Sequence, residues 1–173
     1  MVNGTLGDLR KAFDEAFASP LDEKTPHEDL LAVTIAGDPY AFRIRDIASL
    51  WARPTIVPLP SRRSDLLGLA GLRGALVPVY SLALTMGYPM AGPPPRWLVA
   101  CGSRAPLAFA FEEFERYLRV PTSEIRGGAP PGRQRSHVDQ LAGDGPLLRG
   151  IVDLTSIVRA LTEEAPQEGR IRR

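Results

Sequence analysis

The feature that most constrains the fold of this chain is a series of short apolar runs, none longer than seven residues. Gly, Pro and Asp turn residues separate these runs, which read LLAVTIA, YAFRI, ALVPVY, WLVAC, LAFAF and GIVDL. Runs of this length between turn signals are typical of β-strands. Because only brief helical stretches follow each set of strands, the sequence predicts a mainly β protein built from two small antiparallel barrels.

Turn residues indicate how the first strands pair and where the ladders break. The run Gly37-Asp38-Pro39 predicts a hairpin turn, so the first two strands should pair. Proline cannot donate to a strand ladder, which places residues 53–65 at an edge or in a loop. For the same reason, Pro78 should occupy an edge or bulge position.

The chain divides into an arm, a body and a tail. Residues 1–28 are predicted to be an acidic arm and linker, and we expect one amphipathic helix there whose apolar face carries Leu6, Leu9, Phe13, Ala16 and Phe17. The body spans residues 29–162, and the proline-rich tract 91–95 separates lobes at about 29–90 and 96–162. Residues 163–173 should be a disordered tail. We expect the arm to dock on its own body, with a partner-binding arm as the alternative.

Composition narrows the functional classes. The chain has 173 residues, 44% of them hydrophobic, and a formal net charge of +1, which would not by itself attract nucleic acid or an anionic membrane. No stretch approaches the length of about 18 apolar residues that a membrane span needs. Cys101 is the only cysteine, which excludes an intrachain disulfide and favours the cytoplasm. At the end of an apolar strand, its thiol should be buried and inert.

Reactive or cofactor-binding motifs are not evident. His27 and His137 have no metal-ligand spacing, so we predict no metal site. The glycines from Gly68 to Gly74 follow a GxxGxxG pattern, which does not predict a dinucleotide site, and we expect no cofactor. Glu113 and Glu115 alternate with Phe114 and are interpreted as a solvated strand face. The sequence therefore predicts that the chain is not an enzyme.

Two classes of binding protein remain. A nucleic-acid-binding small β-barrel module is the alternative, and it depends on six arginines of the first lobe: Arg43, Arg45, Arg53, Arg62, Arg63 and Arg73. Aromatic residues suited to base stacking do not alternate with these arginines, so we expect no nucleic-acid partner. A protein-binding adaptor is favoured by elimination.

Several motifs resemble one family when taken in order. PYAFRIRDIASLW is followed by a proline-rich turn ending in VPLP and then by LLGLAGLRGALVPVYSL. Further on come LAFAFEEFERYLRVP and GIVDLTSIVRAL. Together these resemble the CheW family of chemotaxis coupling proteins over roughly residues 29–161.

The resemblance implies a fold and a set of partners. It implies two intertwined five-stranded barrels of the Src-homology type and no catalysis. It also implies an adaptor between chemoreceptor cytoplasmic tips and the regulatory domain of a CheA-type histidine kinase. The protein would then lie in the cytoplasm, at membrane-associated receptor arrays reached through its partners, with no insertion into the membrane itself.

The resemblance also implies site residues. The kinase-binding residues would be Leu31, Ile44, Ile47 and Leu50, although these four could equally be core. The receptor-binding residues would be Leu72, Arg73, Gly74, Val77 and Val79.

Four positions depart from the family pattern: Gly71 at the asparagine of NLRG, Ser81 at the aspartate of PVxDL, Ser49 at a common glutamate, and Trp51. In the family pattern, the residue at the position of Arg73 lies near the carboxylate at position 49. Ser49 can accept a hydrogen bond from Arg73 but cannot neutralise its charge. We therefore expect Arg73 to be at least partly exposed, or paired with Asp46 or Asp65, because a buried unpaired cation is costly.

Overall fold

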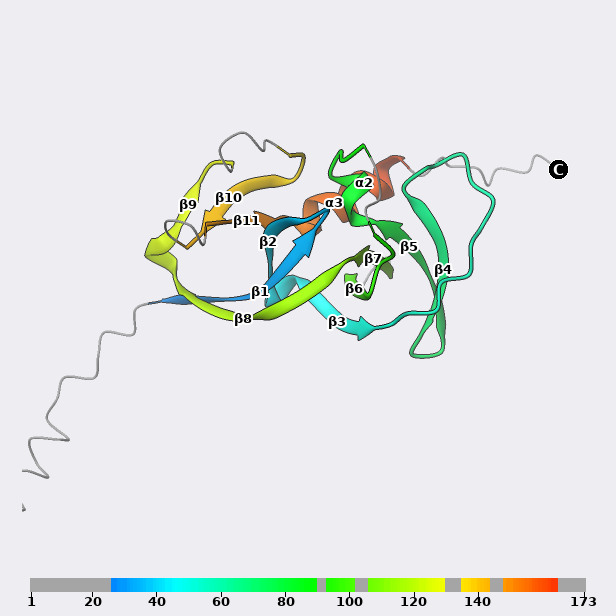
Figure 1. The fold of residues 1–173 in the computed structure, drawn as a ribbon, viewed down its shortest axis with the longest axis horizontal. Coiled ribbons are helices and arrows are strands. Elements are labelled where there is room, and N and C mark those ends of the chain that lie inside the picture. Colours follow the sequence, from blue (N-terminus) through cyan, green and yellow to red (C-terminus); the bar gives the residue numbers. More distant parts are fainter. Residues whose placement is uncertain (1–25, 90–92, 102–105, 130–134, 144–147, 165–173) are drawn as a thin grey trace, which may run out of the picture.

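The computed structural model describes residues 26–89, 93–101, 106–129, 135–143 and 148–164. They form two β-sheets that lie side by side with short helices between them (Figure 1). The sequence-based expectations for the arm helix and its docking, and for tail residues 165–173, concern positions outside this described part.

The first sheet has six strands in the order β8-β1-β2-β11-β10-β9. These are β1 (His27–Ile35), β2 (Asp38–Arg43), β8 (Glu113–Pro121), β9 (Ile125–Gly127), β10 (Val138–Ala142) and β11 (Arg149–Val152). The family resemblance implies five strands here. The additional strand is β9, which has three residues and a single apolar side chain, too little for a recognisable pattern. It forms because the short helix η2 (Thr122–Glu124) turns the chain back, so that β9 pairs with β10.

The second sheet has the predicted five strands, in the order β3-β6-β7-β5-β4. These are β3 (Ile47–Ala52), β4 (Leu66–Leu72), β5 (Ala75–Ser81), β6 (Trp97–Cys101) and β7 (Leu107–Phe111). The short helix η1 (Ile44–Asp46) carries the chain from β2 into β3, and so from one sheet to the other. The predicted lobes 29–90 and 96–162 each contribute strands to both sheets, so the two halves are intertwined and not consecutive.

The first hairpin forms as predicted, but its turn lies earlier in the chain. β1 and β2 pair antiparallel, and the turn residues are Ala36 and Gly37, with φ of 50° and 80°. Two successive positive φ values match the right-handed twist of a two-residue hairpin, and proline cannot adopt them. Pro39 therefore lies within β2, opposite Thr34.

The prolines occupy positions without ladder bonds. Residues 53–65 are largely loop, with an isolated bridge between Val57 and Leu69. Pro78 lies in β5 opposite Leu69, whose N–H and C=O both bond to Val57. The pairing of β5 with β7 covers only residues 79–81, so β5 is locally an edge at Pro78. The prediction from proline chemistry is confirmed in this local sense.

The main core lies between the two sheets and joins them. Val33 and Phe42 from the first sheet pack with Val99 and Phe109 from the second, and Phe42 meets Phe111 edge to face at 5.3 Å. Two smaller cores lie within the individual sheets. We call the main core the large core, and we call the two smaller ones the second-sheet core and the first-sheet core. Burial of large apolar side chains at about 1.5–3 kcal/mol each stabilises the joined arrangement.

Two hydroxyl groups and one carboxyl group also link β2 of the first sheet to the segment that follows β5 of the second. The hydroxyls of Tyr40 and Tyr88 lie 2.7 Å apart, and the Tyr88 hydroxyl donates to Asp38 Oδ2 at 2.7 Å. Tyr40 and Asp38 lie on β2, whereas Tyr88 follows the short helix α2 (Leu82–Thr85) after β5. Burial, followed by these hydrogen bonds, raises the pKa of Tyr88, so the phenol stays protonated and can donate.

Helices begin where the sequence predicts that strands end. Ser81 caps α2 by accepting the Leu84 N–H, and it occupies the position of the family aspartate. Asp153 caps α3 (Leu154–Glu164) by accepting the Ser156 N–H at 2.9 Å. Helix α3 extends two residues beyond the predicted end of the body at 162, so the first part of the predicted tail is helical.

The strand alternation predicts that Glu115 lies on a solvated face, but in the structure its carboxylate is held by an ion pair. Arg149 on β11 is buried, with 8% of its surface exposed, and donates to both Glu115 carboxylate oxygens at 3.0 and 2.6 Å. Thr34 donates a further hydrogen bond to the same carboxylate. A β-bulge in the pairing of β1 with β8 leaves Glu115 without a paired residue, which sequence alternation cannot reveal.

Candidate protein-interaction surfaces

An exposed apolar surface lies on the first sheet, and we call it the edge patch: Leu31, Ile44 and Tyr117. Leu31 on β1 pairs directly with Tyr117 on β8, so the two side chains share one sheet face. Tyr117 is 50% exposed and Ile44, in η1, is 36% exposed, whereas Leu31 is half-buried. The Tyr117 hydroxyl donates to Asp29, and this bond raises the pKa of Tyr117.

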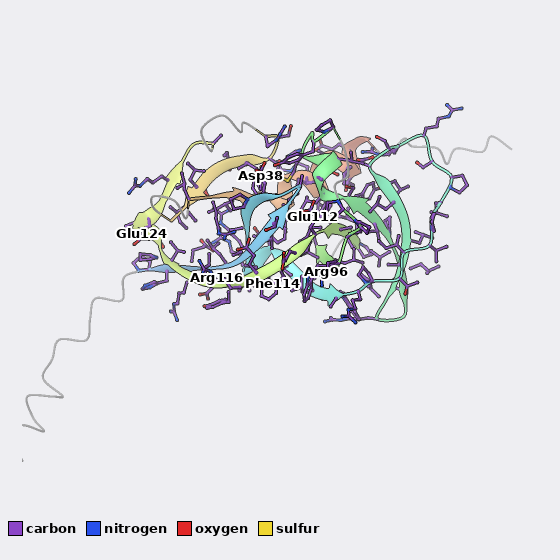
Figure 2. The ribbon with its side chains drawn as sticks, viewed as in Figure 1. Asp38, Arg96, Glu112, Phe114, Arg116 and Glu124 are labelled. Carbon is purple, nitrogen blue, oxygen red and sulfur yellow. The ribbon has the colours of Figure 1, made fainter. Side chains whose placement is uncertain are left out.

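The four predicted kinase-binding residues do not form one surface. Leu31 and Ile44 belong to the edge patch, but Ile47 and Leu50 lie on β3 and pack half-buried against the large core. Phe114 on β8 packs against the same core beside Trp97, with ring centroids 5.6 Å apart, and Figure 2 shows Phe114 near Arg96, the residue before β6. Ile47 and Leu50 therefore support the junction of the sheets.

The predicted receptor-binding residues divide into an exposed turn and buried strand positions. Arg73 and Gly74 form the turn between β4 and β5, with φ of 50° and 81°, and both are exposed. Leu72, Val77 and Val79 are buried in the second-sheet core. Their side chains can hold the turn in place, but only Arg73 and Gly74 present surface to a partner.

Arg73 is exposed, as expected for a cation without a nearby carboxylate. Asp65 is bonded to Arg63 at 2.8 Å, and Asp46 lies by Arg45. Within the described ranges, no ion pair is found for Arg73. Its guanidinium is therefore available to a carboxylate of another molecule.

Two of the positions that depart from the family pattern are in contact. The Trp51 indole Nε1 donates to Ser49 Oγ at 2.9 Å, and the Trp51 ring packs against the second-sheet core. The serine hydroxyl thus satisfies an indole N–H that packing brings to this site.

A second exposed apolar surface, which sequence reasoning missed, lies on β4 and β5. We call it the hairpin face: Val57, Leu69, Leu76 and Pro78. Val57 pairs with Leu69, and Leu69 with Pro78, so these side chains share one face, and Leu76 lies on that face two residues before Pro78. Leu76 is 74% exposed and Val57 is 59% exposed. Strict alternation with the buried Val77 and Val79 would have predicted that Leu76 points outward.

Cys101 and His137, whose side chains could support chemistry, are buried or hydrogen-bonded within the fold. Cys101 is buried, and burial followed by the charge of Asp46 raises the pKa of its thiol to about 12. This confirms that the thiol is buried, and a raised pKa disfavours the reactive thiolate. His137 Nδ1 lies 2.8 Å from Ser156 Oγ at the start of α3. In the described part of the chain, no three His, Cys, Asp or Glu side chains gather as a metal site would need.

Three of the six arginines considered for nucleic acid already have carboxylate partners. Arg43 and Arg45 lie by Glu28, and Arg63 is bound by Asp65. The remaining three, Arg53, Arg62 and Arg73, are exposed. Of the six arginines, the three without a carboxylate partner among the described residues therefore lie in the loop 53–65 and the β4–β5 turn. Among the described helices, none is long and apolar enough to cross a membrane.

The intertwined sheets have the fold of a known scaffold. The structure resembles the crystal structure of the scaffolding protein TtCheW from Thermoanaerobacter tengcongensis with a TM-score of 0.65. The match covers 75% of this chain and 90% of that protein at 16% sequence identity, and shows the shared fold. A comparison with curated protein sequences finds no match.

The sequence itself matches the CheW-like domain over residues 29–160. This chain therefore belongs to the CheW-like domain family, and as a member it is a non-catalytic scaffold of chemotaxis signalling. The resemblance seen in the sequence motifs is confirmed.

Proposed function

We propose that this chain is an adaptor that couples chemoreceptor cytoplasmic tips to the regulatory domain of a CheA-type histidine kinase. The observation that carries the proposal is that the edge patch and the Arg73–Gly74 turn belong to different sheets. Figure 1 draws β1 and β8 on one side of the molecule and β4 and β5 on the other. An adaptor needs two such separate surfaces to hold two partners at once, in the cytoplasm at receptor arrays.

The kinase regulatory domain would bind the edge patch. Tyr117 and Ile44 offer apolar area that is already exposed, and aromatic side chains are common energetic centres of interfaces. Asp29 and Arg119 lie at its rim and form a loose ion pair at 3.9 Å, so the apolar centre has a charged border. Ile47 and Leu50 pack against the large core from β3 and are not part of this surface.

The receptor tip would bind the Arg73–Gly74 turn. The exposed guanidinium fits a carboxylate on the receptor, and guanidinium–carboxylate pairs can form two parallel hydrogen bonds. The buried Leu72, Val77 and Val79 fix the turn relative to the sheet.

Coupling to the kinase would be weaker than in a family member that has a carboxylate at position 49. Ser49 is neutral and its hydroxyl accepts the Trp51 indole N–H, so it offers no charge to a partner. Introducing Ser49→Glu should raise the affinity for the kinase domain toward that of other family members. Ser123→Glu, at an exposed position in η2, is the matched control and should leave the affinity unchanged.

Titration calorimetry with each partner separately tests the assignment of the two surfaces. Ile44→Asp should weaken binding of the kinase regulatory domain at least tenfold and leave receptor binding unchanged, because it places a charge in the edge patch. Arg73→Glu should do the reverse. If the wild type binds neither partner, or if both variants bind both partners as the wild type does, the proposal is wrong.

A further inference from the structure

The hairpin face is an exposed apolar surface to which the proposed adaptor role assigns no partner. Val57, Leu69 and Pro78 form one cross-strand row, and the exposed Leu76 lies beside them. Opposite Leu76 lies Gly71, where an added Cβ would meet nothing within 4 Å. The glycine leaves room beside Leu76 for an inserted side chain. Leu59, also exposed, extends the apolar surface along the chain beyond Val57.

The charge around this face is positive. The segment from residue 53 to residue 81 carries four arginines and one acid, Asp65, which is bound by Arg63. The other three arginines, Arg53, Arg62 and Arg73, are exposed. An apolar face with unneutralised arginines in its loop and turn fits an acidic amphipathic segment.

The chain itself contains such a segment. Residues 5–17 carry Leu6, Leu9, Phe13 and Phe17 at helical spacing, and residues 1–25 contain five acidic and three basic side chains. We propose that the N-terminal segment 5–17 of one copy docks on the hairpin face of a second copy. Its leucines and phenylalanines bind the apolar row, and its net negative charge complements the arginines.

A second copy is the occupant because of the reach of the chain. Residues 18–26 join the segment to β1, and nine residues span at most about 30 Å even when fully extended. β1 alone is nine residues, or roughly 30 Å. Figure 1 shows that β1 begins at the end of the molecule opposite to β4. Docking within one chain would thus need a fully extended linker, whereas a neighbouring copy can bring its hairpin face to the segment.

This contact is head to tail, since the segment and the face are different parts of the chain. Such contacts link copies into rings or open strings. The inference goes beyond the adaptor role and does not depend on it, because it concerns two copies of this chain and neither partner.

Sedimentation velocity of the full chain over a wide range of concentration tests the proposal. The wild type should self-associate as concentration rises. Phe13→Ser, in the segment, and Leu76→Ser, on the face, should each weaken self-association at least tenfold. Leu76 is so exposed that its replacement should leave the circular dichroism spectrum and melting temperature unchanged. Tyr117→Ser, which removes an exposed apolar side chain from the other sheet, is the matched control and should associate as the wild type does.

Mixing the two weakened variants gives the sharpest result. The Phe13→Ser copy keeps its face and the Leu76→Ser copy keeps its segment, so the mixture should form a one-to-one dimer that neither variant forms alone. A wild type that stays monomeric at every concentration would overturn the proposal. A mixture that does not associate would also overturn it, and this is the result that docking within one chain would give. A Tyr117→Ser variant whose self-association is weakened as much as that of Leu76→Ser would overturn it as well.

Discussion

Ile44 and Ile47 are only three residues apart, but they differ in burial and therefore in what they contribute. Ile44 is exposed in η1, whereas Ile47, three residues later, packs against the large core. A charge at Ile47 must lose water or disrupt packing, and a charge at Ile44 need do neither.

We therefore predict that Ile47→Asp destabilises the protein by about 2–4 kcal/mol, and that Ile44→Asp changes the free energy of unfolding by less than about 0.5 kcal/mol. Urea unfolding followed by circular dichroism measures both. Equal stability of the two variants would show that Ile47 is a surface residue.

The pair of Glu115 and Arg149 should make stability depend on pH. Hydrogen bonds from Arg149, the largest cause, hold the pKa of Glu115 below its usual value. A carboxyl with a lowered folded-state pKa contributes stability above its unfolded pKa, about 4.3, and loses that contribution as pH falls through the folded pKa. Glu115→Gln should thus cost about 1–3 kcal/mol at neutral pH, because it leaves Arg149 buried without a counter-charge.

The measurement is the free energy of unfolding of wild type and Glu115→Gln as a function of pH. The difference between them should be constant at neutral pH and shrink in acid, below roughly pH 4. A difference that stays the same through the acid range would mean that the carboxylate charge contributes nothing.

At the scale of elements, the loop 53–65 is held to β4 by a close backbone approach. Gly68 has φ of 146°, and a Cβ there would lie 2.0 Å from the Val57 carbonyl oxygen. The bulge at this glycine admits the bridge between Val57 and Leu69.

Gly68→Ala should therefore lower the free energy of unfolding by more than about 2 kcal/mol. Gly71→Ala, three residues along the same strand, meets no atom within 4 Å and should be tolerated. Thermal melts of the two variants compare them directly, and a similar melting temperature for both would contradict the close approach.

Elements with a strong local pattern were predictable, and elements set by distant contacts were not. The apolar runs predict most strands, and capping residues accompany the two α-helices of the described residues, because these signals act within a few residues. The strand β9 has no apolar run, and the bulge at Glu115 depends on pairing with β1. In the candidate site, the exposure of Arg73 could be predicted because a buried, unpaired cation is costly. The position of Tyr117 in the edge patch could not be predicted, because it depends on the register of β8 against β1.

At the scale of the whole molecule, the two sheets are joined by packing and by the contacts of Tyr88, which tie the segment after β5 and α2 to β2. Tyr88→Phe removes the hydroxyl that meets both Tyr40 and Asp38, and so removes both of these hydrogen bonds. It should cost about 1–3 kcal/mol of unfolding free energy. Tyr117→Phe removes an exposed hydrogen bond to Asp29 and should cost little. Chemical denaturation measures both variants, and an equal cost would mean that the Tyr88 contacts do not help to join the sheets.

The central claim is that one chain holds two partners at once through surfaces on different sheets. The most direct measurement is sedimentation velocity of this chain mixed with a CheA-type kinase regulatory domain and a chemoreceptor cytoplasmic fragment. The account predicts a species containing all three proteins. This species should be lost with either Ile44→Asp or Arg73→Glu, while each variant keeps one binary complex. If the kinase domain and the receptor fragment instead displace each other from the chain, the two surfaces are one and the account is contradicted.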